Sequence, residues 1–260
     1  MPWECRSGVF AVAWARLRGE NWPLMARPPV ILTPENFRIH VVHYTPFTER
    51  RVHMEKLIRE NGLDRFPVSW MLDHDREALL EAFHNGEWGD PAKIAASSVS
   101  LILKHLAVYQ RISNEPDRWH LVIEDDLLTR PHLIDNMQLC LAELPEDWEL
   151  LFIGEGCGLH VPWWRRRPGK RVYFRGWKPW WRAGGGTSRC TEAYFVAPSF
   201  AQRLLASRFA RPPFDCPVDW HLAKAGYEMH IRSYWAEPPL AGQGAFESWT
   251  KNPHLNELLK

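Results

Sequence analysis

The sequence has no apolar run close to the roughly 20 residues that a membrane-spanning helix requires, so an integral membrane protein is not expected. It also has little excess charge of either sign. Its formal net charge at pH 7 is +1, which excludes a molecule that binds polyanions with its whole surface. Internal repeats and low-complexity segments are absent from the sequence as well. Any preference for charged partners must therefore come from a local patch.

Cysteine is scarce and scattered. The five cysteines show no CxxC spacing, so neither a disulfide framework nor a zinc site is expected. This pattern fits a reducing compartment, and we expect a cytoplasmic protein, with peripheral contact at the inner membrane surface left open. Residues 8–15 (GVFAVAWA) are similar to a short signal-peptide core, but the charges around them favour a helix or an N-terminal extension over residues 1–36.

The sequence does contain enough apolar material for one sizeable domain, because 45% of its 260 residues are hydrophobic. Apolar runs predict strands, and helical spacing predicts helices between them. Strands are expected at 37–44, 65–72, 119–126, 148–154, 191–197 and 228–235, and helices at 48–62, 97–112, 132–144, 199–207 and 217–226. Thr48 is expected to cap the first helix, and Pro131 to lie in the first turn of the third. The alternation predicts a single α/β domain over 37–260, with a Rossmann-like, mostly parallel sheet flanked by helices.

Three acids stand side by side where one predicted strand ends. Glu124, Asp125 and Asp126 follow the apolar run at 119–123, and ligands of open α/β sheets bind at the carboxyl ends of the strands. Neighbouring carboxylates repel one another, and a divalent cation with oxygen ligands, Mg²⁺, Ca²⁺ or Mn²⁺, relieves that repulsion. Because such an ion also binds substrate phosphates, the motif indicates a phosphorylated substrate. A solvated loop leading into an acidic helical turn is the alternative.

Several motifs occur in a characteristic order between about residues 38 and 248. They are ERR with Arg50 and Arg51, a strand ending at Asp73, LILKHLAVYQRI, LVIEDDLL, DWELLFIG, TEAYFVAPSFAQRLL, PVDWHLA and PPLAGQGAFES. In this order and spacing the chain resembles glycosyltransferase family 25, which includes bacterial lipooligosaccharide galactosyltransferases and collagen galactosyltransferases. The resemblance implies a GT-A fold, in which the acidic motif holds a divalent metal, usually Mn²⁺, against the diphosphate of a nucleotide sugar.

The resemblance also implies roles for individual residues. The metal, Mn²⁺ or Mg²⁺, would be bound by Asp126 and Asp125, and Glu124 with Asp125 would orient the metal or reach the donor. Further donor contacts are implied for Asp73, Arg50, Arg51, Gln243 and Ser248. For each of these residues a non-functional role is the alternative. Asp73 would be a turn residue, the arginines would lie on a solvated helix face, and Gln243 and Ser248 would lie in loops.

An inverting transferase also needs a base that deprotonates the acceptor hydroxyl. Asp219, at the start of a predicted helix, is the candidate, and Asp215 is the substitute. Stabilisation of the helix by an acid in its first turn is the alternative. The histidines are ambiguous: His105 lies where the family has a Leu-Ser-His motif, but Lys104 replaces the serine. His221 or His230 could supply a late metal ligand.

A basic and aromatic loop is expected at about 155–190, where Glu155 is the only acid. Loops of this length inside a compact domain are usually functional, and we expect this one to bind the acceptor. The residues expected to do so are Trp163, Trp164, Arg165, Trp177, Trp180 and Trp181. The alternatives are binding of single-stranded nucleic acid, contact with an anionic membrane that carries a lipid-linked acceptor, and a β-hairpin with arginines stacked on tryptophans.

Taken together, the acidic motif and the resemblance to family 25 imply a metal-dependent, inverting glycosyltransferase that moves a hexose, galactose or glucose, from a UDP sugar to a hydroxyl group. The acceptor would be a glycan, a lipid-linked glycan or a protein. Two other classes stay open. One is a phosphotransferase or nuclease that uses the same acids with a second metal. The other is a non-catalytic or nucleic-acid-directed GT-A-like protein whose Arg/Trp loop binds nucleic acid or anionic membrane.

Overall fold

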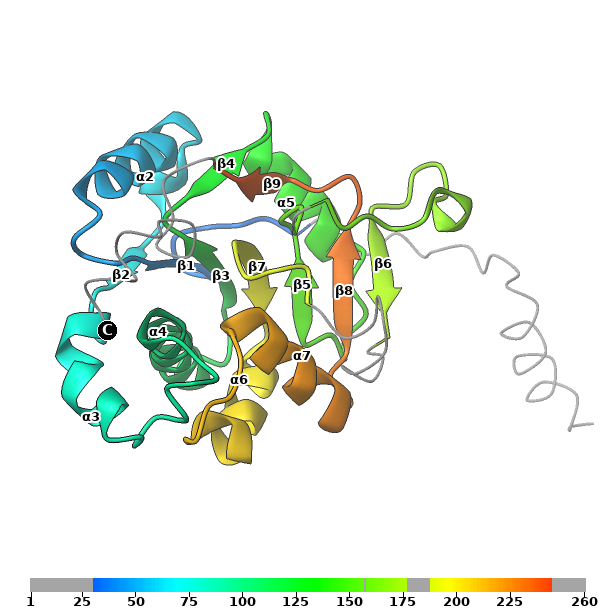
Figure 1. Cartoon of the computed structure of the whole chain (residues 1–260). Coiled ribbons are helices and arrows are strands. Elements are labelled where there is room, and N and C mark those ends of the chain that lie inside the picture. The colour runs from blue at the N-terminus through cyan, green and yellow to red at the C-terminus, as the bar shows by residue number, and fades with distance from the viewer. Residues whose placement is uncertain (1–29, 157, 177–187, 245–260) are drawn as a thin grey trace, which may run out of the picture.

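The computed structural model describes residues 30–156, 158–176 and 188–244. Its centre is a seven-stranded sheet with the strand order β2-β1-β3-β7-β5-β8-β6 (Figure 1). The strands of this sheet are β1 (Phe37–Val42), β2 (Val68–Met71), β3 (Trp119–Glu124), β5 (Leu150–Phe152), β6 (Val172–Arg175), β7 (Ala193–Val196) and β8 (Ser233–Ala236). A separate antiparallel pair is formed by β4 (Leu127–Thr129) and β9 (Ala241–Gln243).

Most strands of the sheet run in one direction. β7 is antiparallel to both of its neighbours, β3 and β5, and β6 is antiparallel to β8. The other five strands, β1, β2, β3, β5 and β8, therefore point the same way. The predicted α/β class, with one mostly parallel sheet in a single domain, is confirmed. The carboxyl ends of β1 and β3 lie side by side at one edge of this sheet, because Val42 pairs with Glu124.

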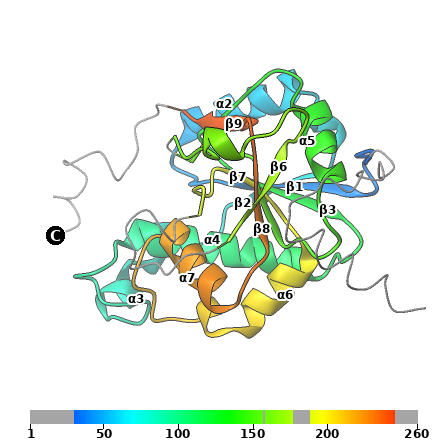
Figure 2. The same cartoon turned by 90° about the vertical axis from the view of Figure 1, so that its right-hand side faces the viewer.

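Helices cover both faces of the sheet, as Figure 2 shows. One face carries α2 (Thr48–Glu60) and α5 (Leu133–Ala142), and the other carries α4 (Ala96–Ser113), α6 (Pro198–Ala206) and α7 (Val218–Glu228), with the short α3 (Leu80–His84) beside α4. Alternation along the strands produces the two cores. In β3, Leu121 and Ile123 pack with the α2 and α5 side, whereas Val122 packs with the α4, α6 and α7 side. In the described part of the chain, no helix is both long and apolar enough to cross a membrane.

Three local predictions are wrong, each for a local reason. Phe47, not Thr48, occupies the N-cap position of α2, and no side chain caps that end. Pro131 precedes α5, which begins at Leu133 after His132 adopts a left-handed conformation with φ 58°. The strand predicted at 228–235 begins only at Ser233, because α7 continues through Glu228 and a turn follows, with His230 at φ 53°.

Part of the predicted basic and aromatic loop belongs to the sheet. β6 pairs antiparallel with β8 at the edge of the sheet, and its Val172 and Tyr173 are buried. At the other end of the chain, Leu32, within the expected extension, packs into the core, and its backbone N–H donates to Gln138 Oε1 at 2.9 Å. One segment predicted as a loop thus adds a strand to the sheet, and one residue of the predicted extension adds to the core.

Candidate active site

A cavity of about 380 Å³ opens at the carboxyl ends of β1 and β3. Its walls come from the β1–α2 connection, the start of α4, the acidic motif, the start of β7 and the start of α7. Its lining includes five carboxylates, Glu124, Asp125, Asp126, Glu192 and Asp219, and three cationic side chains, Arg50, Arg76 and Lys104. The acidic motif therefore lies where the strand-end rule placed it, inside a cavity large enough for a small ligand.

Asp125 has donors on both of its oxygens. His43 Nδ1 lies 2.8 Å and the Tyr44 N–H 3.1 Å from Oδ2, and Arg50 donates to Oδ1 at 2.8 Å. Burial alone would raise the pKa of Asp125, but the hydrogen bonds from His43 and Arg50 outweigh it, so the pKa is lowered. Asp125 is therefore ionised at neutral pH, and it holds Arg50 against the rim of the cavity.

Asp126 is buried, and only one of its two carboxylate oxygens has hydrogen-bond donors in the described part of the chain. Its Oδ2 accepts a hydrogen bond from Gln243 at 3.0 Å and lies 3.4 Å from the Arg50 guanidinium. Its Oδ1 has no hydrogen-bond partner among the described residues. Burial, and then the charge of Glu124, raises the pKa of Asp126 to about 6. One oxygen of Asp126 thus lacks a hydrogen-bond partner among the described residues, while the other is held by two donors.

Two further acids have an oxygen in the same condition. Within the described residues, Glu124 Oε1 and Glu192 Oε2 are buried without a hydrogen-bond partner. His105 Nε2 lies 3.4 Å from Glu124 Oε1 without hydrogen-bond geometry, while His105 Nδ1 bonds the Tyr194 hydroxyl at 2.7 Å. Three carboxylates of the cavity therefore keep a free acceptor.

Glu192 is the residue that sequence reasoning missed. It precedes β7, is 2% exposed, and accepts a hydrogen bond from the Gly156 N–H at 2.6 Å. Burial is the largest cause that raises the pKa of Glu192 to about 7. A Cβ at Gly154 would overlap the Glu192 carboxylate, so any larger residue there would displace the Glu192 side chain. The sequence did hold one signal for this residue: Glu192 is an acid directly before the wholly apolar run of residues 193–196.

Lys104 has a defined structural role. Its ammonium group, 2% exposed, donates to the carbonyl oxygens of Leu72 at 3.2 Å and Asp73 at 2.7 Å and lies 2.8 Å from Asp75 Oδ1. It thus ties α4 to the end of β2. The Asp73 side chain is exposed and does not line the cavity, so the predicted nucleoside contact has no support from its position.

Asp219 lines the cavity from the first turn of α7. Burial is the main cause that raises its pKa, and the charge of Glu124 adds to this effect. Asp215, the substitute, is exposed outside the cavity lining and pairs with Lys224 at 2.7 Å. Of the two acids predicted as a base, only Asp219 faces the carboxylates of the motif.

Other predicted site residues separate into two groups. Arg50 and Gln243 line the cavity, whereas Arg51 stacks over Trp70 at 3.5 Å and pairs with Glu55 at 2.7 Å. His221 and His230 do not line the cavity, and His221 Nε2 bonds the Phe209 carbonyl at 2.8 Å.

Of the residues predicted to contact the acceptor, Trp163, Trp164 and Arg165 also lie outside the cavity lining. Trp177, Trp180, Trp181 and Ser248 fall outside the described residues.

A divalent ion in this cavity would depend on the carboxylates of the acidic motif. Among the described residues, no group of three or more His, Cys, Asp or Glu side chains is arranged to hold a metal by itself. A magnesium-type ion, however, needs only one or two carboxylates, with water and substrate phosphates completing its ligands. The free oxygens of Asp126 and Glu124 fit that requirement. Both oxygens of Asp125 already have donors, which makes Asp125 a poorer ligand than the sequence predicted.

No protein-family model matches the chain. Over 125 residues, 46% of the chain, the sequence is 25% identical to "Putative glycosyltransferase R655" of Acanthamoeba polyphaga mimivirus, and the match spans 38% of that protein's length. Among solved structures, a glycosyltransferase involved in the glycosylation of the major capsid of PBCV-1 aligns at 12% identity with a TM-score of 0.44, covering 86% of this chain and 98% of that one. Mouse xyloside xylosyltransferase 1 in its apo form aligns at 13% identity with a TM-score of 0.34, covering 89% and 82%. By sequence similarity, the chain is glycosyltransferase-like.

Proposed function

We propose that the protein is a metal-dependent, inverting glycosyltransferase, related to family 25, that transfers galactose or glucose from a UDP sugar to a hydroxyl of a glycan-type acceptor. The observation that carries this proposal is the cavity itself, where free carboxylate oxygens lie beside Arg50, Arg76 and the starts of two helices. The similarity to a mimivirus glycosyltransferase supports the reaction class.

The donor diphosphate would bind on the cationic side of the cavity. Arg50 and Arg76 line it, and so do Ser97 and Ser98 in the first turn of α4. A helix N-terminus presents unpaired backbone N–H groups and a partial positive charge, which favours phosphate binding. The pair between Arg50 and Asp125 fixes the direction of the Arg50 guanidinium before the donor arrives. The donor therefore meets charges that need little rearrangement.

Asp126, with Glu124 beside it, would hold a divalent ion, Mn²⁺ or Mg²⁺. Such an ion, when bound, stabilises the negative charge that develops on the leaving diphosphate. Gln243 has a positioning role, because its amide holds Asp126 Oδ2 and thereby directs Oδ1. Burial and the charge of Glu124 raise the pKa of Asp126 to about 6, and a divalent cation bound to this carboxylate would lower it.

Asp219 is the proposed base. Its carboxylate would accept the proton of the acceptor hydroxyl while that oxygen attacks the sugar. A raised pKa improves a carboxylate as a base at neutral pH, because proton affinity rises as long as the ionised form still predominates. Glu192, which also lines the cavity with a free oxygen, is the other carboxylate within the same enclosure.

The test is binding and slow hydrolysis of UDP-galactose, UDP-glucose and their N-acetyl forms, with Mn²⁺ and with chelator. One donor should be bound and hydrolysed only with metal. This activity should be lost in Asp126→Ala and kept in Asp117→Ala, an exposed aspartate outside the cavity lining. If the wild-type protein neither binds nor hydrolyses any of these donors with any metal, the proposal is wrong. A non-catalytic GT-A-like protein then becomes the better interpretation.

A further inference from the structure

An unusual surface is formed by residues 163–170, called here the Trp163 turn. All eight residues of this run, WWRRRPGK, are exposed. Trp163 and Trp164 are 78% and 69% exposed, more than any other large apolar side chain in the described part of the chain. Four cations and no acid lie in the same run. Large aromatic side chains exposed to this degree usually mark a contact surface.

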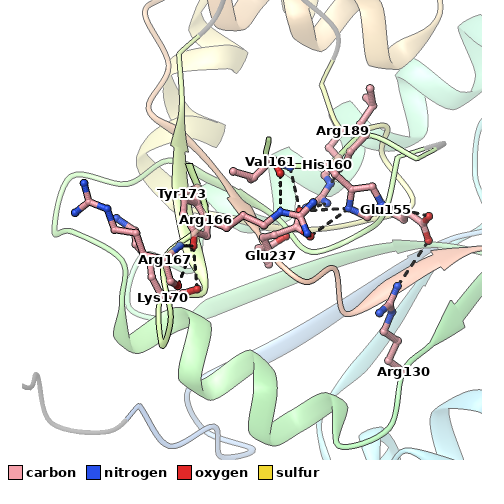
Figure 3. Close-up of polar contacts among 12 residues, drawn as sticks. Arg130, Glu155, His160, Val161, Arg166, Arg167, Lys170, Tyr173, Arg189 and Glu237 are labelled. Carbon is pink, nitrogen blue, oxygen red and sulfur yellow. Dashed lines mark hydrogen bonds and ion pairs between the residues drawn. The ribbon is translucent and has the colours of Figure 1, made fainter. Parts of the chain in front are cut away.

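The Trp163 turn stands on an ordered base. Glu237, 5% exposed, accepts the Val161 N–H at 3.0 Å, and Arg189 and Arg166 contact its carboxylate at 3.2 Å and 3.4 Å. Figure 3 shows Arg166 reaching from the turn toward Glu237.

The C-terminal half of the turn is also held by hydrogen bonds. The Tyr173 hydroxyl accepts from the Arg167 N–H at 2.8 Å and donates to the Lys170 carbonyl at 3.2 Å. The tryptophans are therefore presented by a built structure, and their exposure is a property of the fold.

The Trp163 turn is separate from the cavity. No residue between 158 and 176, a fully described stretch, belongs to the cavity lining. In Figure 1 the turn, between β5 and β6, projects at the edge of the molecule beside the end strand of the sheet. A surface that projects in this way can meet a flat partner without obstruction from the rest of the fold.

We infer that the Trp163 turn docks the protein on the surface of an anionic lipid bilayer. Indole rings are favoured at the level of the lipid head groups, where the apolar ring is buried and the N–H stays hydrated. Arg165, Arg167 and Lys170 follow the two tryptophans in the same exposed run, and their charges complement anionic head groups.

Single-stranded nucleic acid is the less favoured partner. It binds in a cationic groove with rings on which successive bases stack. Trp163 and Trp164 instead meet edge to face, with centroids 5.8 Å apart and an interplanar angle of 87°, and do not form one continuous stacking platform.

This inference goes beyond the transferase proposal and does not depend on it, because binding to vesicles requires no donor. The two are compatible: a bilayer would bring a lipid-linked acceptor to the protein, which was one of the roles open for the aromatic loop. Failure of donor hydrolysis would leave the docking inference standing, and failure of docking would leave the transferase proposal standing.

The test is flotation of the full-length protein with phosphatidylcholine vesicles, either pure or containing about one third phosphatidylglycerol. Three variants are compared with wild type: Trp163→Ala/Trp164→Ala, Arg165→Ala/Lys170→Ala, and the control Val52→Ala/Arg59→Ala. The control removes an exposed apolar and an exposed cationic side chain from α2. All substituted side chains are exposed or at the turn, and circular dichroism and thermal unfolding verify that each variant is folded.

Wild type should float with the anionic vesicles and not with pure phosphatidylcholine. The tryptophan variant should lose at least about tenfold in partition. The cation variant should lose about fivefold per removed charge, and the wild-type partition should fall as salt is added. The control should match wild type.

Absence of wild-type binding to anionic vesicles would overturn the inference, and so would equal binding by the tryptophan variant. A single-stranded oligothymidylate is the competing probe. Binding to it that the tryptophan variant loses, with vesicle binding unchanged, would assign the turn to nucleic acid and overturn the membrane assignment.

Discussion

Asp125 and Glu237 are two buried carboxylates that receive nearly the same donors. Asp125 has a histidine Nδ1, the N–H of the residue after that histidine, and an arginine. Glu237 has His160 Nδ1 at 3.2 Å, the following N–H of Val161, and Arg189 with Arg166. The two clusters differ in what lies next to them. Beside Asp125 are Asp126 and Glu124, each with an acceptor that no described residue satisfies, whereas both oxygens of Glu237 are engaged.

We propose that this difference separates a structural cluster, at Glu237, from a functional one, at Asp125. An unsatisfied buried oxygen costs free energy unless water, an ion or a ligand supplies the missing partner. The Glu237 cluster needs no ligand, and its result is an ordered Trp163 turn. The Asp125 cluster orders Arg50 but leaves its neighbours incomplete. Substitutions can test whether this division between stability and function holds.

The largest expected effect is on stability, at Glu237. Glu237→Gln removes the charge that balances Arg189, whose side chain is 0% exposed. Breaking a buried ion pair from one side destabilises a protein by about 3 to 5 kcal/mol, and urea denaturation should show a loss in this range. The matched control is Glu228→Gln, which breaks the exposed pair with Arg208 and should cost less than about 1 kcal/mol. Equal losses in the two variants would contradict the structural role of Glu237.

The next effect is on activity, at Asp126. Asp126→Asn should lower metal-dependent donor hydrolysis by about a hundredfold or more, because a carboxylate aimed at developing or bound charge is lost from an enclosed site. Its stability should not fall, since the carboxylate is already under-satisfied. Asp117→Asn serves as the exposed control. A variant that keeps wild-type hydrolysis would remove Asp126 from the proposed mechanism.

An effect of opposite sign, a gain in stability at high pH, is expected at Glu192. Its pKa is raised from 4.5 to about 7, so between these values the folded state binds the proton more strongly than the unfolded state. The free energy of unfolding therefore falls as pH rises through this window, by about 3 kcal/mol at about 1.4 kcal/mol per pKa unit. Glu192→Gln should escape this loss and be more stable than wild type at about pH 8, with the difference vanishing toward pH 4.5. Thermal unfolding with chelator at both ends of the window measures it, and a pH-independent difference would contradict the assignment.

The smallest effect is expected at Arg51, compared with its neighbour Arg50. Arg51→Ala removes a stacking contact with Trp70 and a partly exposed pair with Glu55, at a cost of about 1 kcal/mol or less, and should leave donor binding unchanged. Arg50→Ala should weaken donor binding by at least about tenfold, because Arg50 lines the cavity. Isothermal titration with the donor compares the two variants. Equal donor affinities would show that Arg50 does not contact the diphosphate.

The fold followed closely from local patterns. β1, β3 and α4 lie within two residues of their predicted bounds, because long apolar runs and helical spacing are local properties of the chain. β4, β6 and β9 were not predicted. Each has only three or four residues and is stabilised by a partner distant in sequence, and a short run carries too little periodicity to reveal this.

The sequence by itself determined the class of the fold and the position of Glu124, Asp125 and Asp126 at the carboxyl end of a buried strand. Only the tertiary structure decided which of these acids is satisfied. The donors come from far along the chain, Arg50 from 75 residues before Asp125 and Gln243 from 117 residues after Asp126. The same long-range packing encloses Glu192 and Asp219 in the cavity. Hydrogen bonding and burial depend on neighbours in space, which a pattern along the sequence does not encode.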